Sequence, residues 1–384
     1  MVRLCRWKWG RSPKIFALAL LLMGNLGGIT ACRNSPPATE TEPQSQNSEN
    51  RLIVEDALLE QSDAEGNILW KIQAEEAIYS QDRKAATLTK LVGNLYQDGE
   101  VILSLQANKG QVINDGDRII LESGVLVTDN RQGAVFETEK AEWEPANFIL
   151  QITTGLQAKY PNGTLSAKQG KYFIDRQDLE LADTVEVVIV EPPLQLQGSK
   201  LNWLVAEDKI TAAEGLTVQR YTAETITDRL RADQGEAQLK AQKIIVSGNV
   251  LLNSLDPEIQ FASGAATWDI QAGIITGQDS VQLTQTAERV QFRGNQGRYN
   301  LKTQQAQLSG AVRGTGEDPP TSLKANQVDW NLTAEEVVAV GNVVYEQTNP
   351  RVKLNGDRAV GKFKQNQLVV TGSAQKQVTT EVIP

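Results

Sequence analysis

Apolar and polar residues alternate along most of the chain after residue 50. Around Trp268, the apolar residues Ala266 and Ile270 lie two positions away on either side, and polar residues fill the positions between them. The same pattern surrounds Trp330. A period of two places alternate side chains on opposite faces of an extended strand. The pattern therefore predicts β-strands with one apolar face and one polar face.

Large aromatic residues recur at one phase of this pattern, about every 31 residues or at twice that interval. They are Tyr79, Trp143, Tyr172, Trp203, Trp268, Tyr299, Trp330 and Phe363. Two positions of the series lack an aromatic residue and fall near Val112 and Ala237. About ten repeats therefore fill the chain after residue 50.

A glycine follows the aromatic position at a similar interval in most repeats, and such a glycine favours a bulge or a bend at which the sheet folds over. These glycines are Gly93, Gly124, Gly155, Gly215, Gly248, Gly310, Gly341 and Gly372. Asp183 and Asp279 take the place of glycine in two repeats. With one strand on each side of the bend, the repeats predict an all-β antiparallel meander of roughly twenty strands. The segment 223–242 has a composition typical of a helix, but the repeat frame assigns it to strand and turn.

The first 31 residues have the features of a bacterial lipoprotein signal peptide. A basic segment precedes the apolar stretch Ile15–Leu26, which is followed by small residues and then by Cys32. This ending resembles the lipobox, in which cleavage before the cysteine exposes it for acylation. We therefore expect Cys32 to be the lipid-attachment residue. The alternative is an uncleaved signal anchor over 15–31.

The next segment, 32–50, contains no large apolar residue after Cys32 and is predicted to be a disordered tether. Residues 51–384 are predicted to form one continuous β-body or two fused modules of the same architecture. The chain has 38 Lys and Arg and 47 Asp and Glu. Removal of the five cations of the signal region leaves 33 cations and a net charge near −14. Such an acidic body is a poor match for nucleic acid.

The residue inventory excludes several kinds of catalysis. There is no histidine, and the two cysteines are Cys5 and Cys32, so imidazole and thiolate catalysis, Cys/His zinc sites and internal disulfides are excluded. A carboxylate pair of the kind used by sugar-cleaving enzymes requires a cluster that interrupts the repeat. No such cluster is evident. We therefore expect no catalytic residues, no metal and no cofactor.

The order of these features resembles the LptC family of lipopolysaccharide export proteins and, more loosely, its relative LptA. The resemblance is carried by Trp70, Ile72, Ala74, Ala77 and Tyr79, then by Leu88, Gly93, Asn94 and Leu95, and by Leu103, Leu105, Ala107, Gly110 and Val125. Similar blocks recur at Val246, Gly248, Asn249 and Val250 and at Val340, Gly341, Asn342 and Val343. The chain departs from the family in its longer β-domain and its lipoprotein-type signal, so it resembles an extended member.

The resemblance implies an extended antiparallel V-shaped β-jellyroll, whose two sheets enclose an apolar slot for the acyl chains of lipopolysaccharide or a similar glycolipid. It also implies a periplasmic protein that is held at a membrane, the inner rather than the outer one, by its N-terminus. The segment Leu52–Leu59 would face the membrane subunits of an ABC transporter. The end near Gln367–Val378 would bind an LptA-like bridge protein through edge strands, although Lys362, Lys364 and Lys376 there are also compatible with edge protection.

The aromatic series has two interpretations. Its members fill the space between two sheets, or some of them line the lipid slot. The slot candidates are Trp143, Tyr172, Trp203, Trp268, Tyr299 and Trp330. Two other functions stay open at this point: a cell-surface structural or adhesive repeat lipoprotein, and a carbohydrate-active solenoid.

Overall fold

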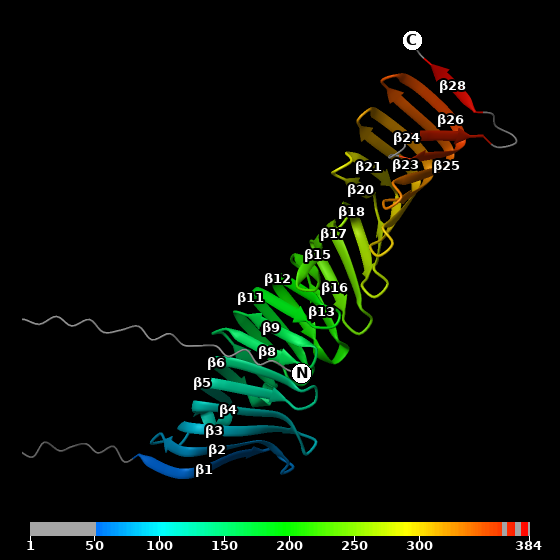
Figure 1. The fold of residues 1–384 in the computed structure, drawn as a ribbon. Coiled ribbons are helices and arrows are strands. Elements are labelled where there is room, and N and C mark those ends of the chain that lie inside the picture. Colours follow the sequence, from blue (N-terminus) through cyan, green and yellow to red (C-terminus); the bar gives the residue numbers. More distant parts are fainter. Residues whose placement is uncertain (1–50, 363–366, 373–377, 383–384) are drawn as a thin grey trace, which may run out of the picture. The chain divides into compact units, whose positions relative to one another are not determined.

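The computed structural model describes residues 51–362, 367–372 and 378–382, and their strands form one antiparallel sheet. Successive strands lie side by side from β1, drawn in blue, to β28, drawn in red (Figure 1). The long strands are β1 (Leu52–Ser62), β2 (Ile68–Tyr79), β3 (Ala86–Gln97), β4 (Glu100–Ile113), β5 (Arg118–Asp129), β6 (Ala134–Glu144), β11 (Asp178–Ile189), β12 (Leu194–Leu204), β17 (Lys243–Leu255), β18 (Glu258–Asp269), β23 (Gln305–Glu317), β24 (Pro320–Asn331), β25 (Glu336–Thr348) and β26 (Arg351–Lys362).

The remaining strands are short and come in seven consecutive pairs, each of which takes the place of one long strand in the pairing order. They are β7 (Ile149–Ile152) and β8 (Leu156–Tyr160), β9 (Gly163–Ala167) and β10 (Gln169–Phe173), β13 (Lys209–Ala212) and β14 (Leu216–Thr222), β15 (Thr225–Ala232) and β16 (Gln234–Gln238), β19 (Ile274–Gln278) and β20 (Val281–Gln285), β21 (Val290–Gly294) and β22 (Gln296–Asn300), and β27 (Gln367–Thr371) and β28 (Thr379–Val382). These interruptions explain why the structure has 28 strands where the repeat predicts roughly twenty. Three short 3₁₀ turns, η1 (Asn114–Gly116), η2 (Pro145–Asn147) and η3 (Val205–Glu207), lie between strands.

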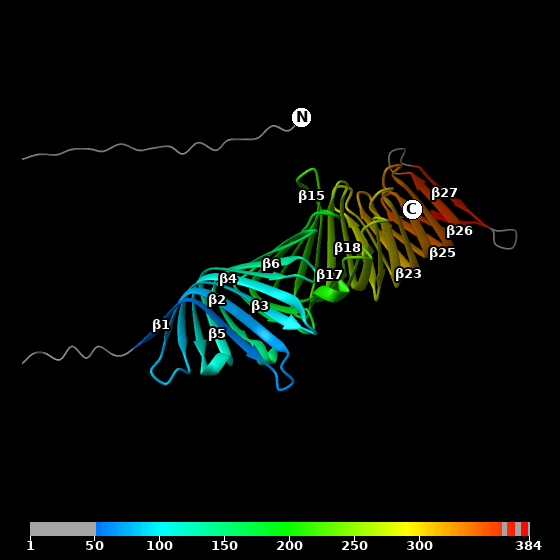
Figure 2. The ribbon, with the colours of Figure 1, turned by 90° about the horizontal axis from the view of Figure 1, so that it is seen from below.

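Each long strand, or each short pair, has two halves on either side of a bend, and where a long strand lies beside a short pair its halves pair with different strands. For example, β6 pairs through its first half with β8 and through its second half with β7. Followed along the chain, the halves make two continuous ladders. We call them layer A, which contains the halves carrying Leu103, Leu196 and Phe261, and layer B, which contains the halves carrying Trp143, Trp203 and Trp268. The view from below in Figure 2 shows how the strands bend between the two layers.

The boundary between the layers, which we call the crease, is made by residues in the left-handed backbone conformation. Pairs of such residues break the register of consecutive long strands: Ser123 and Gly124, Asp183 and Thr184, Gly248 and Asn249, Gly310 and Ala311, and Gly341 and Asn342. Gly155, Gly215 and Asp279 also have positive φ. Glycine tolerates this conformation without steric penalty, and Asp and Asn tolerate it better than most other residues. The predicted fold-over at the repeated glycines is therefore confirmed at these positions.

One glycine of the series has a different role. Gly93 lies within β3 without positive φ, and the bend of that strand falls at Lys90, whose φ is 47°. A Cβ atom at Gly93 would lie 2.9 Å from Cγ1 of Ile72 on the neighbouring strand. The prediction of a bend at Gly93 is thus wrong, because glycine there makes room for a packed side chain instead.

The two layers pack directly on each other near the crease. A row of layer B contains Gly110, Gly170, Gly235 and Gly277, and each of these glycines faces a side chain from layer A. A Cβ atom on Gly235 would lie 2.5 Å from Leu216, and one on Gly277 would lie 2.6 Å from Phe261. These glycines therefore let the layers approach closely, and the core is the space between them.

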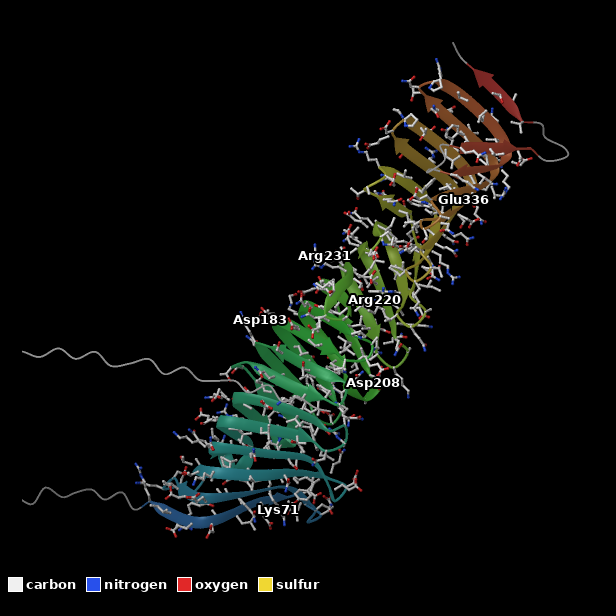
Figure 3. All side chains as sticks on the ribbon, viewed as in Figure 1. Lys71, Asp183, Asp208, Arg220, Arg231 and Glu336 are labelled. Carbon is white, nitrogen blue, oxygen red and sulfur yellow. The ribbon has the colours of Figure 1, made fainter. Side chains whose placement is uncertain are left out.

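The structure agrees with the predicted fold class and with the strand assignment of the one segment whose composition is typical of a helix. The all-β folded-over antiparallel meander is confirmed, and the segment 223–242 forms β15 and β16 rather than a helix. Figure 3 shows side chains on both faces of the sheet, with Asp183 of the crease and Asp208 of an outer turn near opposite borders. We call the border opposite the crease the mouth. It is formed by the turns that join successive strands at the outer ends of the two layers.

Candidate functional site

The six aromatic slot candidates lie in one row of layer B and point into the space between the layers. The row can be followed by direct strand pairing, for example from Trp143 through Leu150 to Tyr172. It continues through Leu179 to Trp203, and further along it contains Trp268, Tyr299 and Trp330. All six are buried, and Trp203, the most exposed of them, has 5% of its surface accessible. In this structure they are core residues of the gap between the layers.

The two positions without an aromatic residue belong to the same row. Val112 pairs with Ile119, and Ala237 pairs with Ile210 and Ile244. Both are buried. The period read from the sequence therefore identifies a physical row of the sheet, while Phe363, the last member of the series, lies outside the described residues.

Aromatic residues of layer A meet this row across the gap, and the repeat period did not identify them. Trp70 packs against Trp143 with ring centroids 6.4 Å apart, and Tyr160 stacks on Trp203 at 4.1 Å. Phe292 contacts Trp330 at 5.2 Å. The layer A aromatics alternate with polar residues like the others, but they do not recur at a fixed interval. Alternation was the one signal that could have placed them in the core.

A buried carboxylate crosses the gap near the mouth. Asp129 of layer A is fully buried and accepts hydrogen bonds from Arg131 at 2.6 and 3.1 Å. The hydroxyl of Tyr172, from layer B, donates to the same carboxylate at 2.5 Å. The guanidinium of Arg131 also donates to the backbone carbonyl of Ile174, at 2.6 Å. The charge is therefore paired and hydrogen-bonded, as a buried carboxylate requires.

A second ion pair lies further along the mouth. Arg220 donates through Nε to Asp228 at 2.7 Å, and Asp228 is 1% exposed. The guanidinium of Arg220, which is labelled in Figure 3, lies 5.7 Å from the ring centre of Trp268 in layer B. Three buried polar atoms in this region have no hydrogen-bond partner: Oδ1 of Asp228, Nε1 of Trp268 and the hydroxyl of Tyr299.

The buried tyrosines titrate abnormally. Burial raises the pKa of Tyr172, and the negative charge of Asp129 raises it further. Burial likewise raises the pKa of Tyr160 and Tyr299, with smaller contributions from Asp129 and Asp228 respectively. All three side chains are therefore neutral over the physiological pH range, and of the three only the hydroxyl of Tyr172 has a hydrogen-bond partner.

An apolar cavity of about 80 Å³ lies between the layers near the C-terminal end of the sheet. Its lining includes Phe292, Leu323 and Tyr345 from layer A, with Val337 and Leu368 from layer B. Gly314, Gly316 and Gly361 leave space around it. Leu323, Tyr345 and Leu368 are only partly buried, in contrast to the closed core in the middle of the sheet. An apolar ligand therefore has space beside partly exposed side chains in this part of the gap.

The two ends of the sheet differ in exposure from its middle. β1 pairs with β2 on one side, and its apolar residues Leu52, Ile53 and Leu58 are each more than 40% exposed. At the other end, β26 pairs with both β27 and β28, and Lys362 forms an ion pair with Glu336 at 3.7 Å. Lys364 and Lys376 lie outside the described residues, as does Cys32.

The described residues contain neither a cluster of metal ligands nor a membrane-spanning helix. In 51–362 and the two short segments that follow, no three Asp or Glu side chains are close enough together to hold a metal ion. Over the same residues, no helix has the length and hydrophobicity to cross a membrane.

The model of the LptC-related lipopolysaccharide-assembly family matches residues 16–151 and 192–317, which are together more than half of the chain. The chain belongs to this family. No curated protein matches this LptC-related chain. Among solved structures it is similar to LptH, the LptA-homologous periplasmic component of the lipopolysaccharide transport device of Pseudomonas aeruginosa. That similarity has 11% sequence identity and a TM-score of 0.21, and it covers 41% of this chain and 95% of LptH.

Proposed function

We propose that this LptC-related protein carries lipopolysaccharide or a similar glycolipid through the periplasm, with the acyl chains held between layers A and B. The observation that carries the proposal is the apolar cavity beside Leu323 and Tyr345, which lies in the same gap as the buried aromatic row. Apart from the ion pairs at Asp129 and Asp228, the gap is lined mainly by apolar side chains, while the outward faces of the strands are mostly polar. Acyl chains would occupy the cavity, and elsewhere along the gap they would displace side-chain contacts.

The energy for this entry comes from burial of apolar surface. Each methylene group that leaves water contributes about 0.8 kcal/mol, so a glycolipid with several acyl chains gains many kcal/mol. Part of this gain is spent on separating layers that are packed together in the structure described here. Hydrophobic contacts between side chains can be exchanged for contacts with an acyl chain at little net cost, because both are apolar. Transport by such exchange needs no catalytic residue.

The position of the protein in a transport chain is part of the same proposal. Cys32, acylated after signal cleavage, would hold the N-terminus at a membrane, preferably the inner one, and the segment 33–50 would serve as the tether. The exposed apolar strand β1 would contact the membrane subunits of an ABC transporter. β27 and β28 at the other end would bind an LptA-like bridge protein by strand addition, since unpaired edges recruit strands.

The direct test is photocrosslinking in living cells with the full chain. A photoreactive residue replaces Leu323, which lines the cavity, and in a second variant replaces its neighbour Lys324, which points outward. We expect lipopolysaccharide adducts at Leu323 and none at Lys324. Adducts at both positions would indicate surface contact rather than a lipid slot.

The contrary result is also informative. If Leu323 gives no adduct while an established component of the same transport pathway is labelled in parallel, the gap is a plain core. The structural or adhesive lipoprotein would then become the better account.

A further inference from the structure

The mouth of the gap is crossed by polar contacts at one place in the N-terminal half of the sheet. The turn between β5 and β6 belongs to layer A, and the turn between β10 and β11 belongs to layer B. Both turns lie at the outer ends of their strands. We call the contact between them the latch, and it consists of Asp129, Arg131, Gln132, Tyr172, Ile174 and Gln177.

We propose that the latch is a gate, which must open before a lipid held between the layers can pass from the β1 end of the gap to the β28 end. The inference rests on the proposed function. If acyl chains lie inside the gap and the polar head group lies outside, the lipid occupies the mouth wherever it sits. A head group cannot move past the latch while the two turns are joined there.

The chemistry of the latch distinguishes it from the other contacts between the layers. The pairs Trp70 with Trp143 and Phe292 with Trp330 are apolar, and an acyl chain can take the place of either partner. An acyl chain cannot replace the hydrogen bonds that Tyr172 and Ile174 make to the Asp129–Arg131 pair. Separation of the layers therefore costs more at the latch than at these aromatic pairs.

The latch is also built so that it can open without leaving an unpaired charge. Asp129 and Arg131 belong to the same turn and are joined by two side-chain hydrogen bonds and by the backbone N–H of Arg131, at 2.9 Å. These bonds stay within layer A when the layers separate. Opening breaks the bonds to Tyr172 and Ile174, and the weak contact between Gln132 and Gln177 at 3.5 Å. The loss of three hydrogen bonds is a cost that lipid binding can offset.

The decisive experiment locks the latch in the full chain. Gln132 and Gln177 are replaced by cysteine and joined by a short bis(methanethiosulfonate) crosslinker, which forms one disulfide with each thiol and is cleaved by reductant. A matched control joins cysteines at Glu186 and Gln197, which are direct neighbours within layer A and are linked at 3.2 Å. Photoreactive residues at Ile72, on the β1 side of the latch, and at Leu323, on the β28 side, then report lipopolysaccharide in cells.

With the latch locked, we expect adducts to persist at Ile72 and to be lost at Leu323, and reductant should restore them. The control pair should leave both positions labelled. Adducts at Leu323 that are unchanged by the lock would overturn the gate while leaving the proposed function intact. Absence of adducts at both positions in the unlocked chain would instead overturn the proposed function, and the gate with it.

A second variant addresses the case in which the cysteine pair does not fold. Tyr172→Phe keeps the ring in the core and removes one bond of the latch. We expect adducts at Leu323 to form faster in this variant than in the parent chain, while labelling at Ile72 is unchanged. A slower or equal rate at Leu323 would contradict the gate.

Discussion

The hydroxyl of Tyr172 lies 2.5 Å from Oδ2 of Asp129, and this hydrogen bond joins the two layers of the sheet across their mouth. The two residues are 43 positions apart and belong to strands of different layers, Asp129 to β5 and Tyr172 to β10. Tyr299 belongs to the same aromatic row of layer B as Tyr172, yet its buried hydroxyl has no hydrogen-bond partner. The two tyrosines therefore allow the value of one cross-layer bond to be measured.

Tyr172→Phe removes a hydrogen bond to a buried carboxylate and leaves the ring in place. We expect it to lower the free energy of unfolding by about 1.5–3 kcal/mol, the usual value for a bond to a charged group. Tyr299→Phe is the matched control and should not lower stability, because its buried hydroxyl has no hydrogen-bond partner to lose. Urea denaturation followed by tryptophan fluorescence measures both. Equal effects of the two changes would show that the hydroxyl of Tyr172 contributes nothing specific.

The same tyrosines predict how stability depends on alkaline pH. Burial raises the pKa of Tyr299 above its ordinary value of 10.0, so the folded protein keeps a proton that the unfolded chain releases. This contribution to stability is complete below pH 10 and is lost as the pH rises further. At pH 11, the raised pKa of Tyr299 should lower the free energy of unfolding by about 1.4 kcal/mol, and a variant without the hydroxyl should not show this loss.

Tyr299→Phe should therefore be at least as stable as the parent chain at pH 7, and its advantage in free energy of unfolding should be larger by about 1.4 kcal/mol at pH 11. Urea titrations at both pH values provide the comparison. If the two chains lose the same stability between pH 7 and pH 11, the hydroxyl of Tyr299 ionises as readily in the folded protein as in the unfolded chain, and the fold does not shield it from solvent.

Much of the architecture follows from short-range patterns in the sequence. Alternation and a constant interval place Trp143 and Trp268 in one row, because each repeat adds the same number of residues to the sheet. Glycine recurs where the strands fold, since few residues tolerate positive φ, as Gly248 and Gly341 illustrate. Features that recur from strand to strand in the sheet therefore recur at a constant interval in the sequence.

The contacts between the two layers do not recur at a constant interval in the sequence. Tyr160 of β8 meets Trp203 of β12, and Asp129 of β5 meets Tyr172 of β10, so the layers are staggered by several strands at the mouth. The stagger results from sheet twist and side-chain packing, which no local pattern encodes. For this reason the sequence identified the aromatic row but neither its partners in layer A nor the latch.

Close packing of the layers predicts an effect of added volume near the crease. A Cβ atom on Gly297 would lie 2.6 Å from Cγ1 and 3.1 Å from Cβ of Val281, a β-branched residue that cannot turn aside easily. Gly297→Ala should destabilise the protein by about 1–3 kcal/mol. Gly361→Ala is the control, because its nearest side-chain atom, on Leu368, lies 3.8 Å away. Thermal unfolding measures the melting temperatures of the two variants. Equal values would mean that the layers move apart to accommodate the added methyl group at little cost.

The crease makes opposite predictions for two adjacent residues. Ala311 has φ of 50°, a conformation that costs a residue with a Cβ atom about 1–2 kcal/mol. Ala311→Gly removes this strain but increases the freedom of the unfolded chain, so the net gain should be at most about 1 kcal/mol. Gly310→Ala should destabilise, since φ is 81° and the new Cβ would lie 2.8 Å from Asn295. Denaturation midpoints that move in the same direction for both variants would contradict the role of the crease.

The ion pair of Arg220 and Asp228 should contribute little to the net free energy of unfolding. Removal of only one of the two partners should nevertheless be strongly destabilising. Asp228 is 1% exposed, so Asp228→Leu leaves the guanidinium of Arg220 beside an apolar core without its counter-ion. We expect a loss of about 3–5 kcal/mol. Replacement of both residues by leucine should recover most of that loss, because well-packed apolar side chains often substitute for a buried ion pair without penalty. A double-mutant cycle by urea denaturation tests this, and a double variant as unstable as Asp228→Leu alone would show that the pair is needed for the packing of the layers themselves.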